Sequence, residues 1–333
     1  YLPFNTVYQL YDDLINDEEL TTQAVNILLI PDLISYHLTG SLYTELTNAS
    51  TTGLLDARKK TWINTFELMD KHIMKFPEFI KLGETYGVIK NIPEIPQVPV
   101  VSVCSHDTAS AFASVRTKIN QALISSGTWS LVGTVIERPN LSDDSFKKNF
   151  TNELGIYHHT RYLKNVMGLW IINQIKETLA QVNEHHSFFD LEKKAITSEP
   201  FKYFIDPDHV MFLEPGDMIE RVKTYTEKTG QGKPKYLSEV LRAVYESLAF
   251  KYRFIIEDME KMLETRMDEI VIIGGGNQSR LLNQFTANVS NRKVIIGATE
   301  ASVYGNGLVQ MFYNKDIKSI KTGQNIIMES LNQ

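Results

Sequence analysis

The sequence predicts an α/β protein with two domains. Its 333 residues exceed what one hydrophobic core usually organises. Residues 100–114 have the pattern of a short apolar strand, a polar bend and a helix of small residues. Residues 270–289 repeat that order, with a β-branched strand, a glycine turn and a helix. We expect the domain boundary near residue 118, with domains at 1–118 and 119–333.

The first domain is expected to be helical near its start and to contain a proline-rich connector. Pro31 suits the first turn of a helix, and Gly40 suits its C-terminal end. Three prolines within Ile92–Pro99 exclude both a helix and a central strand there. The strand at Val100–Cys104 follows this connector and leads through a polar bend into the next helix.

The second domain is expected to open with a hairpin and to contain one long helix. Residues 122–136 read as two apolar strands joined by a turn at Gly127-Thr128. Between residues 237 and 262 the apolar positions recur in steps of three and four, which predicts a helix with one buried face. A strand at 293–296 and a helix from about residue 300 complete the pattern.

The net charge, the single cysteine and the absence of long apolar runs in the sequence indicate which binding partners and which cellular location to expect. With 34 Lys+Arg against 40 Asp+Glu, the net charge of -6 gives little support to a nucleic-acid surface. The single cysteine, Cys104, cannot build a disulfide framework, which favours a reducing compartment and therefore the cytoplasm. No apolar run approaches the length needed to cross a bilayer, so no membrane partner is expected. The start at Tyr1, without an initiator Met, fits a processed or truncated chain.

The turn Gly274-Gly275-Gly276 is the strongest local signal of a binding site. Glycines between a strand and a helix let a ligand approach the backbone, and the helix N-terminus offers N–H groups to a phosphate. A tight structural turn is the alternative, because a glycine cluster alone is weakly specific. The segment matches neither the P-loop nor the dinucleotide-binding glycine pattern.

Asp107 is the candidate general base. It follows the strand at 100–104, where a rigid element can carry a carboxylate to the crevice beyond the strand ends. The alternative is that Asp107 only caps the following helix. His106 can contact a ligand, hold the Asp, or be an ordinary hydrogen-bonded residue. The adjacent Ser105-His106-Asp107 is not a catalytic triad, whose members converge from separate parts of a fold.

The hairpin tip Ser125-Ser126-Gly127-Thr128 is a second candidate phosphate contact. Hydroxyl and N–H groups in one small concavity suit an anion, and a plain turn is the alternative. Neither His158-His159 nor His185-His186 has the spacing of a helical metal pair, so we infer no structural metal site.

Three separated segments resemble one family. They are Val103–Ala111, Ile124–Leu131 and Ile272–Ser279, supported by Thr47–Thr52 and Leu163–Trp170. On these residues the chain is identified as a member of the FGGY carbohydrate kinases, in the actin-like ATPase superfamily. The combination of His-Asp-Thr-Ala-Ser-Ala with Ser-Ser-Gly-Thr-Trp-Ser is most similar to the rhamnulokinase branch. The resemblance implies an α/β fold of the actin-like ATPase (ribonuclease H-like) kind, with two domains.

The resemblance implies a reaction and its sugar-side residues. The γ-phosphoryl group of ATP would be transferred to the 1-hydroxyl of L-rhamnulose, in L-rhamnose catabolism, with Mg²⁺ bridging the phosphates. Asp107 would be the general base that deprotonates the hydroxyl. His106, Asp107, Thr108 and Asn165 would contact the sugar. The remaining sugar-binding domain would lie at 1–118 and the ATPase domain at 119–333.

The resemblance also implies contacts to ATP. Thr128 would reach the phosphates from the hairpin, and Gly275 would lie against the nucleotide. Asn173 stands where the family carries a Gln that contacts ATP, while Gln174 is its neighbour. The acidic, glycine-containing phosphate hairpin with which family members begin is not in this sequence. We therefore expect a chain truncated at its N-terminus, with an incomplete first domain and negligible kinase activity as given.

Two other functions stay open on the sequence. The chain could belong to another FGGY ketose or polyol kinase, such as an L-fuculokinase, because the motifs constrain the sugar only through the resemblance. It could also be a nucleotide-binding module without catalysis, since actin-like folds serve in assembly and regulation. The sequence leaves the oligomeric state undecided.

Overall fold

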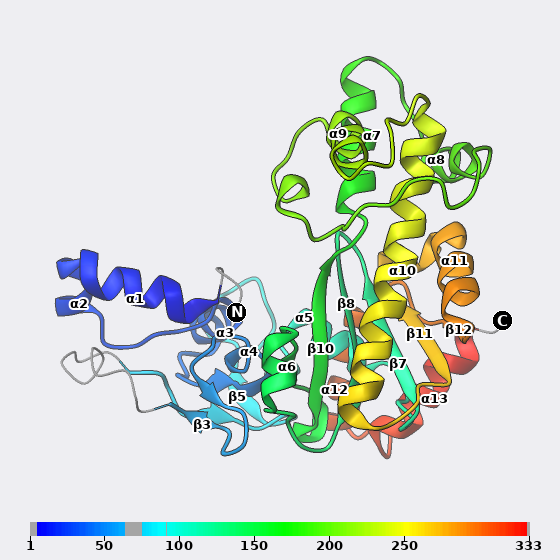
Figure 1. Ribbon diagram of the computed structural model, residues 1–333. Helices are drawn as coiled ribbons and strands as arrows, with labels where there is room; N and C mark the ends of the chain where they lie inside the picture. The colour runs from blue at the N-terminus through cyan, green and yellow to red at the C-terminus, as the bar shows by residue number, and fades with distance from the viewer. Residues whose placement is uncertain (1–4, 64–74, 91, 332–333) are drawn as a thin grey trace. The chain divides into compact units, whose positions relative to one another are not determined.

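The computed structural model describes residues 5–63, 75–90 and 92–331 (Figure 1). It forms two compact units. Unit 1 comprises Tyr1–Arg116, Val135–Tyr162 and Ala301–Gln333, and unit 2 comprises Thr117–Thr134 and Leu163–Glu300. The chain first passes from unit 1 to unit 2 after Arg116, close to the domain boundary expected near residue 118. Two later segments, Val135–Tyr162 and Ala301–Gln333, belong again to unit 1. The assignment of 1–118 to sugar and 119–333 to ATP stays a prediction.

Unit 1 begins with helices, as expected. Pro31 lies in the first turn of the third helix, and Gly40 ends that helix in the left-handed conformation, with φ 77°. Asp17 caps the second helix by accepting a 2.8 Å hydrogen bond from the N–H of Leu20. The three helices are α1 (Thr6–Asn16), α2 (Glu18–Gln23) and α3 (Ile30–Thr39).

Short two-stranded sheets follow in unit 1. The strand predicted at 100–104 occupies only 99–101, because its partner strand begins at Thr85, which pairs with Val101. Residues 92–98 contain neither helix nor strand, in agreement with the connector predicted at Ile92–Pro99, except that Pro99 is the first residue of a strand. The strand pairs are β1 (Thr44–Glu45) with β4 (Phe79–Ile80), β2 (Leu55–Asp56) with β3 (Thr61–Trp62), and β5 (Thr85–Val88) with β6 (Pro99–Val101); α4 (Leu46–Ala49) follows β1.

The helix predicted after the polar bend is α5 (Asp107–Ala113), and its small residues allow a close helix contact. It packs against α12 (Ala301–Tyr313), where a Cβ atom added to Gly305 would lie 1.7 Å from the backbone oxygen of Ser110. Only glycine permits this approach. Unit 1 also contains α6 (Asp143–Lys147), β9 (Thr151–Leu154) and α13 (Ile320–Leu331).

The larger sheet has the strand order β12-β11-β7-β8-β10-β9. The predicted hairpin is confirmed, since β7 and β8 pair in antiparallel register through Ser126 and Ser130. The strand predicted at 270–273 is also confirmed, and it pairs in parallel with both β7 and β12. The strands are β7 (Gln121–Ser126), β8 (Trp129–Ile136), β10 (Thr160–Met167), β11 (Glu269–Ile273) and β12 (Lys293–Ile296).

The long predicted helix of unit 2 is confirmed as α10 (Leu237–Leu263), drawn in yellow in Figure 1. Its buried face includes Val244, Leu248 and Tyr252, at the predicted helical spacing. The hydroxyl groups of Tyr252 and Ser130 are 2.6 Å apart, which ties the helix to β8. Further helices of unit 2 are α7 (Trp170–Gln181), α8 (Phe188–Ala195), α9 (Met218–Lys228) and α11 (Arg280–Ser290).

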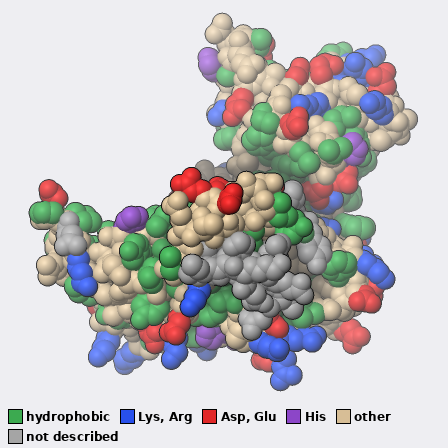
Figure 2. All heavy atoms as spheres, turned by 90° about the vertical axis from the view of Figure 1, so that its left-hand side faces the viewer, with side chains coloured by type: hydrophobic (Ala, Val, Ile, Leu, Met, Phe, Trp, Pro, Cys, Tyr) green, Lys and Arg blue, Asp and Glu red, His purple; other side chains and the backbone are tan. Residues whose placement is uncertain are grey.

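Acidic and basic side chains are interspersed over the described part of the face shown in Figure 2. Within residues 5–63, 75–90 and 92–331, no helix combines the length and apolar character needed to cross a membrane.

Candidate active site

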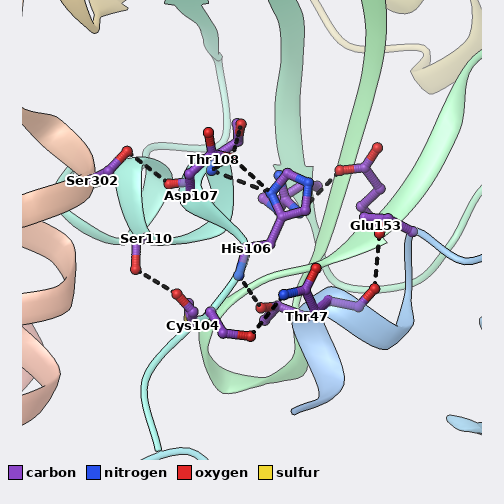
Figure 3. Close-up of polar contacts among 12 residues, drawn as sticks. Thr47, Cys104, His106, Asp107, Thr108, Ser110, Glu153 and Ser302 are labelled. Carbon is purple, nitrogen blue, oxygen red and sulfur yellow. Dashed lines mark hydrogen bonds and ion pairs between the residues drawn. The ribbon is translucent and has the colours of Figure 1, made fainter. Parts of the chain in front are cut away.

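His106, Asp107 and Thr108 meet at the N-terminus of α5 in unit 1 (Figure 3). His106 is the N-cap residue, and its Nδ1 atom accepts a 3.2 Å hydrogen bond from the N–H of Thr108. The carboxylate of Asp107 accepts from the same N–H at 2.6 Å and from the hydroxyl of Thr108 at 3.2 Å. The sequence-predicted trio therefore forms one hydrogen-bonded group.

Asp107 has features both of a helix cap and of a general base, the two roles that the sequence left open. Its Oδ1 atom contributes to the cap of α5, but His106 holds the N-cap position itself. The Asp107 side chain is 83% exposed, so its carboxylate can reach a substrate. A helix N-terminus also attracts negative charge. The geometry is compatible with a general base that is oriented by its own helix.

The ring of His106 is mostly buried, with its side chain 22% exposed. Burial, followed by the nearby positive charge of Arg161, lowers the pKa of His106, while Glu153, Asp107 and Glu45 oppose this shift. The ring is therefore neutral at pH 7. Because Nδ1 accepts from a backbone N–H, the ring proton lies on Nε2. His106 can thus donate one hydrogen bond from Nε2.

Sequence reasoning missed the buried ion pair of Arg161 and Glu153, both in unit 1. The Nη2 atom of Arg161 lies 3.0 Å from Oε2 of Glu153, and these side chains are only 1% and 10% exposed. The Nε–H of Arg161 donates to the backbone oxygen of Leu154 at 3.1 Å, and its guanidinium lies 5.8 Å from the ring centre of Phe112 in α5. The sequence gives no clear signal of this pair, because Arg161 lies in a strand of mixed polar and apolar residues, Thr160–Met167.

Thr128 lies in the turn between β7 and β8 of unit 2, where it is exposed. Its backbone oxygen accepts 3.1 Å hydrogen bonds from the N–H groups of Gly168 and Trp170. The oxygen of Gly127 accepts from the N–H of Leu169 at 2.9 Å. The turn is thereby fixed against the start of α7, which leaves the side chain of Thr128 exposed to a ligand.

The three glycines of the turn after β11 have different surroundings. A Cβ atom at Gly274 would lie 2.8 Å from the backbone oxygen of Ser126, and one at Gly276 would lie 2.2 Å from the Ser126 hydroxyl oxygen. Gly274 also has a φ of 83°. A Cβ atom at Gly275 would meet nothing within 4 Å, and Gly275 is exposed. Two glycines therefore serve the structural turn, and the middle one leaves open space.

The remaining predicted residues also belong to unit 2. Asn165 lies in β10 and is half-buried. Asn173 lies in the first turn of α7 and is half-buried, while Gln174 is buried and donates to the carboxylate of Glu177 at 2.6 Å. The side-chain oxygen of Gln174 also accepts a 3.2 Å hydrogen bond from the N–H of Gly216, so both ends of its amide are engaged. Thr128 follows the end of β7, and the glycine turn packs on Ser126 at that end, while α7, which carries Asn173, begins against the same hairpin turn.

Within the ranges that the structure describes, no cluster of three or more His, Cys, Asp or Glu side chains could hold a metal ion.

The sequence pattern of the FGGY family of carbohydrate kinases, N-terminal domain, matches residues 1–113, and that of its C-terminal domain matches residues 122–313. The chain belongs to the FGGY family of carbohydrate kinases. This FGGY chain is 38% identical to a rhamnulokinase of Ligilactobacillus salivarius (strain UCC118), over 99% of its length and 68% of the relative. A rhamnulokinase of Bacillus subtilis (strain 168) is 36% identical with the same coverage.

Solved structures of two sugar-related kinases share the fold. A gluconate kinase from Lactobacillus acidophilus superposes with a TM-score of 0.75 and 18% identity, covering 97% of this chain and 66% of that one. A xylulose kinase from Rhodospirillum rubrum has a TM-score of 0.76 and 15% identity, with the same coverage. The chain thus spans about two thirds of the length of its relatives. The predicted fold class, family and enzyme class are confirmed.

Proposed function

We propose that this chain carries the catalytic base and the ATP-contacting turns of a rhamnulokinase, which transfers the γ-phosphoryl group of ATP to the 1-hydroxyl of L-rhamnulose. The sugar is suggested by the rhamnulokinases at 34–38% identity. The observation that carries the chemistry is the exposed carboxylate of Asp107 at the N-terminus of α5. The pathway would be L-rhamnose catabolism.

Asp107 would accept the proton of the sugar hydroxyl as its oxygen attacks the γ-phosphorus of ATP. The bond between the γ-phosphorus and the bridging oxygen of ADP breaks in the same step, and ADP leaves. Such a transfer depends on position and on neutralised charge more than on covalent chemistry. A carboxylate fixed at a helix start satisfies the first requirement.

His106 and Thr108 would border the sugar beside the base. Since the neutral ring of His106 carries its proton on Nε2, it would donate a hydrogen bond to a sugar oxygen. Protonation of Nδ1 would break its bond to the Thr108 N–H, which would then be held by Asp107 alone. Asn165 is proposed as a further sugar contact on the strength of the family resemblance.

In unit 2, Thr128 and Gly275 would contact ATP, and Asn173 would take the place of the family's Gln. The open space at Gly275 and the exposed side chain of Thr128 support this proposal. Mg²⁺ would be bound by the phosphates of ATP and would neutralise their charge. The described side chains offer no cluster that fits the ion, so no step here is assigned to it.

We also propose a cytoplasmic location. Cys104 is buried and unpaired, and burial raises the pKa of its thiol to about 12. A thiol of this kind is a structural residue of a reducing compartment, not a disulfide partner.

A coupled assay of ADP release tests the function, with the product identified by mass spectrometry. The protein containing this chain is assayed with ATP, Mg²⁺ and each of L-rhamnulose, L-fuculose, D-xylulose and glycerol. We expect kcat/KM for L-rhamnulose to exceed that for each other acceptor by about tenfold or more. A preference for another acceptor would assign a different FGGY kinase. ATP binding without turnover on any acceptor would favour the nucleotide-binding module.

A further inference from the structure

Two buried side chains hold the backbone immediately before Asp107. The carboxylate of Glu45 accepts a 3.1 Å hydrogen bond from the N–H of Ser105 and a 2.7 Å bond from the Ser105 hydroxyl. The hydroxyl oxygen of Thr47 accepts a 3.3 Å bond from the next N–H, that of His106 (Figure 3). One segment thus binds two successive amides. Glu45 is 60 residues from Ser105 in the sequence, and Thr47 is 59 residues from His106.

Glu45 and Thr47 form one rigid acceptor unit. Oε2 of Glu45 accepts a 2.5 Å bond from the hydroxyl of Thr47, and Oε1 accepts a 2.9 Å bond from the Thr47 N–H. The N–H of Asn48 donates to Oε2 at 3.1 Å. Both side chains are 3% exposed, so water cannot replace these bonds. A buried carboxylate that accepts from several fixed donors has a single well-defined position.

Two further hydrogen bonds hold carbonyl groups at the start of α5. The hydroxyl of Ser110 donates to the backbone oxygen of Cys104 at 2.7 Å, and the hydroxyl of Ser302 donates to that of Asp107 at 2.9 Å. These bonds do not involve Glu45 or Thr47. Glu45 and Thr47 therefore fix the N–H groups of residues 105 and 106. By fixing this backbone they set the direction in which the Asp107 side chain leaves the start of the helix.

We propose that Glu45 and Thr47 are positioning residues for the carboxylate of Asp107, acting through the bound backbone of Ser105 and His106. This inference rests on the proposed function, in which Asp107 is the base. Neither residue touches the sugar in it. A small error in the position of a base lowers the rate of the chemical step more than it lowers binding. Loss of the Thr47 hydroxyl should accordingly reduce kcat and leave both KM values nearly unchanged.

Thr47→Val tests the proposal, because it keeps the side-chain shape and removes the acceptor of the His106 N–H. We expect kcat to fall about tenfold, with KM for ATP and L-rhamnulose changed less than about twofold. Thr47→Ser restores the hydroxyl and should recover most of kcat. The matched control is Thr52→Val, since the Thr52 hydroxyl is also buried and donates to the oxygen of Ala49 at 2.7 Å, away from residues 105–107. It should leave kcat unchanged.

A double-mutant cycle with Asp107→Asn separates positioning from general stability. If Thr47 acts through Asp107, Thr47→Val should lower kcat about tenfold in the wild-type background and have almost no effect in Asp107→Asn. An equal loss in both backgrounds, or in Thr52→Val, would overturn the proposal. Near-normal kcat in Asp107→Asn alone would instead overturn the proposed base. Should Thr47→Val not fold, Glu45→Gln takes its place, with the same pattern expected.

Discussion

The hydroxyl group of Ser302 donates a 2.9 Å hydrogen bond to the backbone oxygen of Asp107, across 195 residues of sequence. Ser302 lies in the first turn of α12, and three residues further on Gly305 allows α12 to approach α5 at Ser110. The proposed base is therefore held at its helix start from two directions, by α12 and by the segment of Glu45 and Thr47.

The close contact of α5 and α12 predicts a severe effect of Gly305→Ala. Its Cβ atom would lie 1.7 Å from the backbone oxygen of Ser110, so the two helices must separate. We expect a loss in unfolding free energy of about 2 kcal/mol or more, with a lower kcat. Chemical denaturation measures the first quantity. Gly307→Ala in the same helix is the control, because its Cβ would meet nothing within 4 Å. Equal stability of both variants would contradict the contact.

Asp107→Asn should lower kcat by a factor on the order of 10² or more, because the amide cannot take the hydroxyl proton. KM for ATP and for L-rhamnulose should change little. The control is Asp143→Asn, an exposed Asp at the first position of α6, preceded by its own N-cap residue Ser142. Steady-state kinetics with both substrates varied makes the comparison. A kcat for Asp107→Asn near that of the wild type would remove Asp107 from the mechanism.

The glycine turn allows steric exclusion of ATP to be separated from damage to the fold. Gly275→Val should fold, since its side chain enters open space, and should raise KM for ATP roughly tenfold with little change for L-rhamnulose. Gly276→Ala should destabilise the protein, because its Cβ would lie 2.2 Å from the hydroxyl oxygen of Ser126. Equal changes of both KM values in Gly275→Val would favour a purely structural turn.

Asp32 should make stability depend on pH. Burial, with Glu45 nearby, raises the pKa of Asp32 to about 7. Between about pH 4 and pH 7 the unfolded chain has lost this proton while the folded protein retains it. The unfolding free energy therefore falls as pH rises through this window, and the contribution levels off above it. Asp32→Asn should flatten that slope, whereas exposed Asp13→Asn should not. Denaturation at several pH values measures the slope, and an unchanged slope in Asp32→Asn would refute the assignment.

Local signals made several elements predictable. The hairpin of β7 and β8, helix α10 and the turn after β11 each follow from neighbouring residues, through alternation, helical spacing or consecutive glycines. The separate roles of Gly274, Gly275 and Gly276 did not follow, because they depend on Ser126 in another strand. A contact between residues in different strands cannot be predicted from the local sequence pattern.

The sequence also did not predict which residues hold the candidate base in position. Glu45 and Thr47 lie 60 and 59 residues from their partners Ser105 and His106 in the sequence. The strand expected at 100–104 was too long, because its partner strand begins at Thr85, opposite Val101. Such details depend on hydrogen bonds between segments that are far apart in the sequence. The type of a residue does not tell which residue it will bond to.

The return of α12 to unit 1 also sets an order of events during synthesis. Helix α5 leaves the ribosome long before its partner, since 195 residues separate Asp107 from Ser302. At about 5 to 20 residues per second, this delay amounts to roughly 10 to 40 s. Throughout that time the small-residue face of α5 lacks the helix that will cover it, and unit 2 has all of its own residues first. The nascent chain therefore completes its second compact unit before its first, and the base acquires its final support only when α12 has emerged.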